Sequence, residues 1–391
     1  MYKRLCCVMI SLTLMLSPSF SALSASRGPV SSYQELQDLL DTAHEGDVIL
    51  ISGSVDCSGG KALSTPVSVR LSSASGESAA LSGLRLKDAR VTFSNIHLND
   101  SLAISGSSHV HLSHNVSVTG SSGSAGISFS GGGSLIVDSS SSVTGGSESP
   151  GVTINHHSGE LYASLEGDVT GGSGYSGGPG VVISPLSSAG AVMISGTIRG
   201  GEGEAIGGHA LNLYGLSGNA FITVDGDLQG GKGSIGGDGV QLVSAVDSVN
   251  VGIGGKIRGG SGDAYGGDAI ILMDADGASA IHLSGEFSGG NALSSRAQPG
   301  TALQMVGNMT TMRTRVDDCL LEDGRYTGAV EPSTVQVTPL PSIPPSENEA
   351  DPSGISASAT PAPSGSDLPE ADIPGEATPS EALPMLEEIA E

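Results

Sequence analysis

The chain has 391 residues, of which 60 are Gly and 12 are aromatic (5 Phe, 7 Tyr, no Trp). Glycine at about twice its ordinary usage, with so few aromatic residues, excludes a globular enzyme built on an aromatic-rich core. The glycines follow no strict three-residue period, which excludes collagen. The formal net charge is −25, from 16 basic and 41 acidic residues. Nucleic acids and anionic lipid surfaces attract basic patches, so neither is expected as a partner.

The first residues have the pattern of an export signal. A basic start, Met1-Tyr2-Lys3-Arg4, is followed by an apolar run from Leu5 to Phe20, and Ala22-Leu23-Ser24 fits a small-residue cleavage site. The apolar run is shorter than the roughly 20 residues of a membrane span. We therefore predict a signal peptide over residues 1–24, a protein that is secreted or associated with the cell surface, and no integral membrane anchor after cleavage.

A short helix is predicted next. Ser32 and Glu35 have the spacing of a capping box. One apolar helix face then follows, made of Leu36, Leu39, Leu40 and Ala43. This pattern predicts an N-terminal cap over residues 25–46 that covers an open sheet edge. Val48 to Ile51 then predicts a buried strand.

An internal repeat dominates the middle of the chain. The motif Gly-x-Φ-x-Gly-Gly, in which Φ is apolar, occurs at Gly167–Gly172, Gly196–Gly201, Gly226–Gly231, Gly255–Gly260 and Gly285–Gly290. Its apolar position recurs at residues 143, 169, 198, 228, 257 and 287, at intervals of 26, 29, 30, 29 and 30. Two further apolar columns keep this period. Each unit therefore offers three short strands, which bury their apolar faces only when units stack.

The repeat predicts an all-β fold, a single-stranded parallel β-helix (β-solenoid). We expect about ten rungs of three short strands over residues 47–316, at the ~4.8 Å spacing of parallel strands. The Gly-Gly pairs are expected at corners that need positive φ. A C-terminal cap is predicted over residues 317–330. Residues 331–391 hold 12 acidic residues, no Lys or Arg, and 12 of the 19 Pro, and are predicted to form a disordered acidic Pro/Ser-rich tail.

This arrangement resembles the right-handed parallel β-helix (pectin-lyase-like) superfamily. The segment from Leu36 to Ile51 looks like that family's N-terminal cap and first rung, and the Gly-rich rungs look like those of adhesin-type bacterial surface proteins. The resemblance covers about residues 33 to 320. The resemblance implies a right-handed coil. It also makes polysaccharide lyase or hydrolase activity a candidate function, because the fold class hosts many such enzymes.

The acidic residues lack the pattern that such enzymes need. Asp168, Asp227 and Glu286 share one column of the repeat, but Thr197 and Lys256 interrupt it. Two rungs span ~10 Å, at or beyond the upper limit for an inverting carboxylate pair. Two other signals are weaker: Asp317-Asp318 lies in the predicted cap, and Gly207-Gly208-His209 lacks the Arg-Ile-Lys signature of the hydrolases. We predict no catalytic residues and expect these charges to be solvated.

The candidate metal sites also lack the pattern that a bound ion would need. His109 and His111 alternate with apolar residues and should both point outward, with His114 nearby, but no further ligand is placed by the sequence. Gly259-Gly260-Ser261-Gly262-Asp263 begins like a calcium-binding nonapeptide, yet the tandem nine-residue period is absent. We predict no metal and no cofactor.

The cysteines test the architecture. Cys57 and Cys319 remain after the signal peptide and should lie near opposite ends of the coil. Since a disulfide needs Cα atoms within ~7 Å, both thiols are expected to be free.

One set of residues is a candidate binding surface. Tyr175, Ile206, Ile235 and Tyr265 occupy nearly matching positions before Gly-Gly pairs, with Tyr175 offset by one. Stacked rungs can align them as an exposed semi-apolar stripe that contacts a ligand. Alternatively they fold back as loop anchors, which is the favoured interpretation.

Together these observations predict an exported, non-catalytic β-solenoid that acts as an extracellular or cell-surface scaffold or adhesin. Glycans and host or cell-surface proteins are the expected partners. The alternative is a carbohydrate-active protein on the same fold, either a polysaccharide lyase or hydrolase or a glycan-binding module. The regular repeat and the spacer-like acidic tail favour the first hypothesis.

Overall fold

The structure is a computed structural model. It describes residues 25–74, 78–156, 159–186, 190–246, 249–275 and 280–306, with three further strand segments after residue 312. These residues belong to one compact unit, residues 1–339. The predicted signal peptide (1–24), the tail (331–391), Asp317-Asp318 and Cys319 lie outside the described residues, as does most of the predicted cap over 317–330. Those expectations therefore stay predictions.

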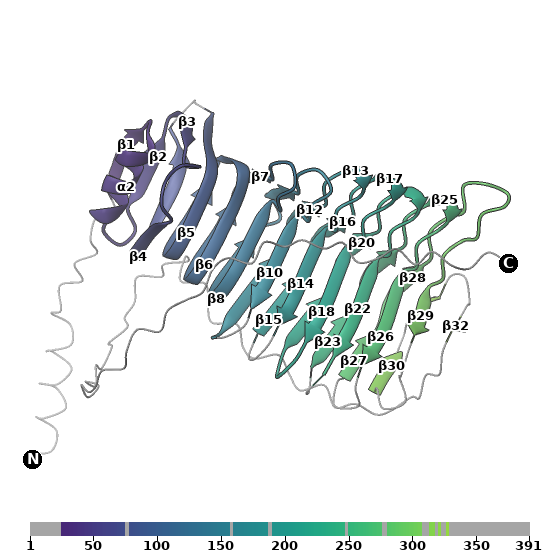
Figure 1. The fold of residues 1–391 in the computed structure, drawn as a ribbon. Helices are drawn as coiled ribbons and strands as arrows, with labels where there is room; N and C mark the ends of the chain where they lie inside the picture. Colours follow the sequence, from purple (N-terminus) through teal and green to yellow (C-terminus); the bar gives the residue numbers. More distant parts are fainter. Residues whose placement is uncertain are drawn as a thin grey trace, which may run out of the picture. The chain divides into compact units, whose positions relative to one another are not determined.

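A coil of parallel strands makes up the described chain, which confirms the predicted parallel β-solenoid. The chain passes through three sides, and each strand pairs in parallel with the strand one turn later (Figure 1). The first side is formed by β1 (Ser26–Val30), β2 (Val48–Ile51), β4 (Leu63–Ser73), β5 (Ala79–Ser94), β6 (His97–Ser113), β8 (Ile127–Val137), β11 (Leu161–Leu165), β15 (Gly190–Ile194), β19 (Phe221–Val224), β23 (Asn250–Ile253), β27 (Ala280–Leu283) and β30 (Arg313–Val316).

The other two sides run alongside, and β4, β5, β6 and β8 are long enough to pass around corners and serve more than one side. The second side continues from β3 (Gly53–Asp56), β5 and β6 through β7 (Ser117–Thr119), β9 (Ser142–Thr144), β12 (Asp168–Thr170), β16 (Thr197–Arg199), β20 (Asp227–Gln229), β24 (Lys256–Arg258), β28 (Glu286–Ser288) and β31 (Leu320–Leu321). The third continues from β4, β5, β6 and β8 through β10 (Val152–His156), β14 (Val181–Leu186), β18 (Leu211–Leu216), β22 (Val240–Ala245), β26 (Ile270–Ala275), β29 (Leu303–Val306) and β32 (Tyr326–Thr327).

The apolar columns of the repeat are the core. Each apolar residue pairs in register with its counterpart one turn later, so like side chains lie above one another between the three sides. The second-side column is fully buried, with 0% exposure for Val169, Ile198, Leu228, Ile257 and Phe287. Stacking therefore supplies the burial that a single unit of the repeat lacks.

Two lengths of turn share this core. On the first side, the successive register partners in the early turns are Arg70, Thr92, His111 and Ile136. The later partners, which run from Ser164 through Met193, Thr223 and Gly252 to His282, are more widely and more evenly spaced along the chain. The predicted repeat thus describes the later turns, whereas the early turns are shorter and irregular in length.

The N-terminal cap contains the predicted helix and one unexpected strand. α2 (Tyr33–Asp41) begins after Ser32, whose Oγ accepts a hydrogen bond from the N–H of Glu35, and it buries Leu36 and Leu40 against the core. The Glu35 carboxylate accepts from the N–H of Ser31 at 2.9 Å, so the capping box is displaced by one residue. β1, inside the segment predicted as a cap, is the first strand of the coil and pairs with β2.

A buried carboxylate fixes this first strand. Asp47 is 1% exposed and accepts hydrogen bonds from the N–H groups of Ala25 at 3.1 Å and His44 at 2.9 Å. It also forms an ion pair with the Nε of Arg27 at 2.8 Å. The N–H of His44, with that of Ala25 and the Arg27 charge, holds the pKa of Asp47 below its usual value, although burial opposes this. One side chain thus ties the start of β1 to the corner before β2.

The Gly-Gly corners do not need positive φ, which corrects the sequence-based expectation. None of the paired glycines after β12, β16, β20 or β24 has a φ in the left-handed region. The reason for glycine there is close approach between turns. A Cβ on Gly208 would lie far inside van der Waals distance of the Gly178 carbonyl oxygen, and a Cβ on Gly201 would meet the Gly172 carbonyl in the same way.

These glycines form a continuous hydrogen-bonded chain along the coil, which we call the glycine chain. The second Gly of each pair donates its N–H to the carbonyl of the second Gly of the preceding pair, and Gly300, which follows Pro299, extends this chain at its end. The nine bonds are 2.7–3.0 Å long. The donors and acceptors are Gly178 to Gly172, Gly201 to Gly178, Gly208 to Gly201, Gly231 to Gly208, Gly237 to Gly231, Gly260 to Gly237, Gly267 to Gly260, Gly290 to Gly267 and Gly300 to Gly290. The chain closes the base of the loop between each two pairs.

The glycine chain yields a first prediction. Gly208→Ala places a methyl group against the Gly178 carbonyl and forces neighbouring turns apart, so we expect a loss of about 2–3 kcal/mol in the free energy of unfolding. Gly252→Ala is the matched control, because its Cβ would meet only the Ile222 oxygen at 4.0 Å. Urea unfolding followed by circular dichroism measures both. Equal stability of the two variants would refute the steric explanation.

Asp47 yields a prediction about pH. A carboxylate whose folded pKa lies below its unfolded value of ~3.9 stabilises the fold at higher pH and loses that contribution as pH falls through the folded pKa. Asp47→Asn should therefore lower stability by about 1–3 kcal/mol at pH 7, as expected for hydrogen bonds to a charged group. The gap between wild type and variant should shrink below pH 4. Thermal melts from pH 3 to 7 test this, and a pH-independent gap would contradict it.

Candidate functional site

A second, separate sheet carries the candidate site. β13 (Gly174–Ser176), β17 (Gly203–Ile206), β21 (Gly233–Ile235) and β25 (Gly262–Tyr265) pair in parallel, one strand from each of four successive turns. We call it the loop sheet. Its strands lie in the loops between the paired glycines, at one edge of the coil (Figure 1). Because the glycine chain closes the base of each loop, the four loops stack with the same period as the core.

The loop sheet exposes the four apolar residues that the repeat picks out. The exposed fractions are 68% for Tyr175, 46% for Ile206, 42% for Ile235 and 53% for Tyr265. The register pairs Ile206 with Ile235 and Ile235 with Tyr265, while Ser176 takes the place in line with Ile206, so the predicted one-residue offset of Tyr175 is confirmed. The interpretation as buried loop anchors is wrong. We call these four side chains the ridge.

Nearly all of the large apolar side chains that are exposed among the described residues belong to the ridge. Only one further large apolar side chain there is exposed, Leu293 at 48%, and it lies in the next loop. That loop continues the sheet through bridges from Ala292 to Gly262 and from Gln298 to Tyr265. Leu293 was not predicted as part of the row, because its loop is longer than the other four. The available signal was the fifth copy of the Gly-x-Φ-x-Gly-Gly motif, which ends at Gly290 just before this loop.

Both edges of the loop sheet are covered. At the first edge, the Glu148 carboxylate accepts hydrogen bonds from the N–H groups of Tyr175 at 2.7 Å and Ser176 at 3.3 Å. At the other edge the bridges to Ala292 and Gln298 lie alongside β25. Exposed strand edges invite pairing with another chain, and these contacts block it. A partner therefore meets the ridge through side chains rather than by adding a strand.

Charged residues accompany the ridge in the same loops. Glu202, Glu204, Lys232 and Asp263 are all exposed. Among the described residues, Glu202 and Lys232 form no ion pair. Asp263, the acidic residue of the calcium-like motif, belongs to β25, so that motif forms part of the loop sheet.

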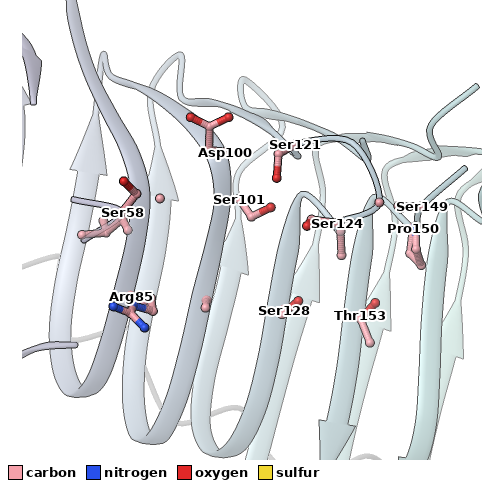
Figure 2. A pocket seen from close by; sticks show the side chains of 15 residues that line it. Ser58, Arg85, Asp100, Ser101, Ser121, Ser124, Ser128, Ser149, Pro150 and Thr153 are labelled. Atoms are coloured by element: carbon pink, nitrogen blue, oxygen red, sulfur yellow. The ribbon is translucent and has the colours of Figure 1, made fainter. Parts of the chain in front are cut away.

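A shallow groove lies on the N-terminal half of the coil and was not foreseen from the sequence. It has a volume of about 690 Å³ and crosses five successive turns, from Ser58 to Thr153 (Figure 2). Its lining is rich in hydroxyl groups, from Ser58, Ser101, Ser121, Ser124, Ser128, Ser149 and Thr153. Arg85 and Asp100 are its charged residues.

The backbone of the groove is unusual at one point. Asp100 and Ser101 are consecutive non-Gly residues with φ of 58° and 78°. The Oγ of Ser101 is buried and has no hydrogen-bond partner among the described residues. Left-handed backbone costs about 1–3 kcal/mol per residue and gathers at functional sites, although it also occurs at tight corners. This makes the groove a second candidate site.

Two of the three residues of the acidic column, which the sequence predicted to be solvated, form ion pairs. Asp227 pairs with Arg258 at 3.2 Å, and Glu286 pairs with Lys256 at 3.5 Å, each across one turn. All four side chains are about half exposed, so these pairs are worth little and the carboxylates still face solvent. Asp168, the third member of the column, is exposed.

His109 and His111 are placed as the alternation predicts, with their side chains on the outer surface. The Nε2 of His111 lies 2.7 Å from the Oδ1 of Asp138, and the Nδ1 of His109 lies 3.0 Å from the Oγ of Ser134. His209 pairs with Asp238 at 3.1 Å. Within the described ranges, no three His, Cys, Asp or Glu side chains gather as a metal site would require.

Cys57 is free and 2% exposed, in the core beside Val55. Burial, with the Asp56 charge, raises the pKa of its thiol to about 11. The thiol is therefore a structural group of the core. The expectation for its counterpart Cys319 stays a prediction.

Comparison with known proteins adds no relative: no family model, curated protein or solved structure matched the chain. None of the helices in the described part of the chain is long and apolar enough to cross a bilayer. Function must therefore be argued from the surface features above.

Proposed function

We propose that the protein is an exported, non-catalytic β-solenoid that acts as an extracellular or cell-surface scaffold or adhesin. One observation carries this proposal: large exposed apolar side chains gather on the loop sheet in a single row. Contiguous exposed apolar surface on a soluble protein commonly marks a contact site. A scaffold needs such a surface held at fixed spacing, and the stacked loops hold it.

The loop sheet is well suited to present side chains. The glycine chain and the covered edges constrain its backbone, so little conformational freedom is lost on contact. Two of the seven tyrosines lie in the ridge, although the chain is poor in aromatic residues. Tyrosine supplies a large contact area with a polar end, as in many protein interfaces.

The remaining parts of the proposal come from the sequence. The signal-peptide pattern over 1–24 supports export, and the acidic Pro-rich composition over 331–391 resembles spacers that carry a domain away from a surface. Membership of the pectin-lyase-like superfamily, and within it of the adhesin type, is part of the same proposal.

A binding screen tests the scaffold function. The purified chain is applied to an array of glycans and host-matrix proteins, beside a variant with Tyr175→Ser, Ile206→Ser, Ile235→Ser and Tyr265→Ser. Burying one such side chain against a partner is worth about 1.5–3 kcal/mol. Even if only two of the four side chains contact the partner, their loss should weaken binding at least ~100-fold. Gln229→Ser, exposed on the second side, is the control. Binding that is unchanged in the ridge variant would contradict the proposal.

A glycan-binding or carbohydrate-active protein is the second candidate, and the groove favours it. Seven hydroxyl-bearing residues line the groove across five turns together with Arg85 and Asp100, whose charges are opposite. Such a lining can exchange hydrogen bonds with a linear sugar chain laid along the coil. The lack of Trp in the chain leaves such a ligand without the strongest stacking partner.

Calorimetric titration with neutral and acidic oligosaccharides tests the groove. Thr153→Val removes one hydroxyl at nearly constant volume and should weaken a glycan bound there about 5–30-fold, through loss of one or two hydrogen bonds. Gln241→Ser, on the third side outside the groove, is the control. New reducing ends or unsaturated products that disappear in Asp100→Asn would overturn the non-catalytic proposal and favour an enzyme.

A further inference from the structure

The ridge is symmetric along the coil. Read in the order of the turns, its side chains are Tyr175, Ile206, Ile235 and Tyr265; the ladder pairs Ile206 with Ile235 and Ile235 with Tyr265, while Tyr175 lies one residue before Ser176, the partner of Ile206. This order reads the same in both directions. A row of this kind matches itself when turned end to end, because each tyrosine then faces a tyrosine and each isoleucine faces an isoleucine.

A second column in the same loops has a matching symmetry of charge. It contains Ser173, Glu202, Lys232 and Ser261, at the start of the four loops. These residues occupy consecutive turns, since the carbonyls of Glu202, Lys232 and Ser261 accept from the N–H groups of Gly174, Gly203 and Gly233. Glu202 and Lys232 are exposed. When the column is turned end to end, glutamate faces lysine and lysine faces glutamate.

One two-fold operation satisfies both columns. An axis perpendicular to the coil, passing between the second and third loops in the plane of contact, brings each row opposite its own reversed copy, with Tyr175 one residue out of line. It also keeps the charged column of one copy opposite that of the other. This is the geometry of an isologous interface, in which residue i meets residue j and residue j meets residue i.

We propose that the ridge is a homodimer interface, occupied by the ridge of a second copy of this chain in antiparallel orientation. Glu202 of each copy pairs with Lys232 of the other, and the isoleucines pack at the centre between the tyrosines. This inference rests on the part of the proposed function that makes the ridge a contact surface. It adds that the partner is a second copy of the chain.

The other charges of the loops agree with this arrangement. Glu204, in the second loop, comes opposite the third loop, where the middle residue is Ser234. Asp263, in the fourth loop, comes opposite the first loop, which has no charged residue in β13. Among the charges of the four loops themselves, the antiparallel match opposes no like pair, although it brings Asp263 to the loop whose edge Glu148 covers. A parallel match would set Glu202 against Glu202 and Lys232 against Lys232.

The arrangement also closes at two copies. A two-fold contact uses the ridge of both partners and leaves none free. The covered edges at Glu148 and at the Ala292 and Gln298 bridges prevent the loop sheet from growing by strand addition. Four side chains per copy form a small interface, so a weak dimer is expected, with a dissociation constant on the order of 10–100 µM.

Charge reversal tests the pairing in solution. Sedimentation velocity is measured on the wild type from about 5 to 500 µM, where the s-value should rise with concentration. E202K sets lysine against Lys232, and K232E sets Glu202 against glutamate, so each single variant should dissociate at least tenfold more readily. An equimolar mixture of the two should form heterodimers, and the double variant E202K/K232E should regain the wild-type dimer.

Matched controls separate pairing from net charge. E160K and K87E make the same charge changes at exposed positions outside the loop sheet, and both should dimerise as the wild type does. Circular dichroism confirms that all variants fold. A wild type that stays monomeric at every concentration overturns the inference, as does a mixture of E202K with K232E that associates no better than either alone. The array screen is a separate readout, so loss of the dimer leaves the scaffold proposal standing.

Discussion

In-register stacking of apolar side chains is the interaction on which this structure depends. Each unit of the repeat offers three short strands, which are too short to bury a face alone. When Ile198 lies between Val169 and Leu228, each shields the others from water, and the same holds along all three sides. Stability is then approximately a sum over neighbouring turns. The outer surface is left free for polar residues and for the loops.

Glycine is the second constraint, and it links the core to the proposed function. Backbones of adjacent turns approach so closely at the two glycine columns that a side chain would collide with a carbonyl one turn away. Because the resulting chain of N–H to C=O hydrogen bonds closes the base of each loop, the loops stack with the same spacing as the turns of the core. Large side chains on those loops are held in a row without a hydrophobic core beneath them. Both proposals for the ridge follow from this rigid spacing.

The sequence predicted what is periodic and missed what is not. The period of the repeat placed Val169, Ile198 and Leu228 in one column, and the structure confirms it. β1 was missed because Ser26–Val30 contains Pro and Gly and has no apolar alternation; it is a strand because Asp47 and β2 hold it. The groove was missed because its hydroxyl groups come from five turns with no common spacing. Serines of that kind look like ordinary turn residues until the coil brings them together.

For the candidate site, the sequence predicted which residues form the ridge but not which way their side chains point. The repeat placed its four residues in corresponding positions, but apolarity alone does not say whether a loop side chain turns inward or outward. The structure decides it: the glycine chain closes each loop at its base, and Ile206 is exposed outside it. For the same reason, the sequence predicted positive φ at the Gly-Gly corners instead of close contact with the next turn. Contact between turns cannot be recognised from the residues of one turn.

Removal of one whole turn tests the stacking account most directly. Deletion of residues 198–227 joins Thr197 to Leu228 and preserves every column, because these segments are register partners. The shortened chain should keep its far-UV circular dichroism and a single cooperative urea transition, with the coil shorter by one rung spacing of ~4.8 Å in small-angle scattering. Deletion of only residues 198–212 shifts the columns and should unfold the later turns. A whole-turn deletion as damaging as the half-turn deletion would contradict the account.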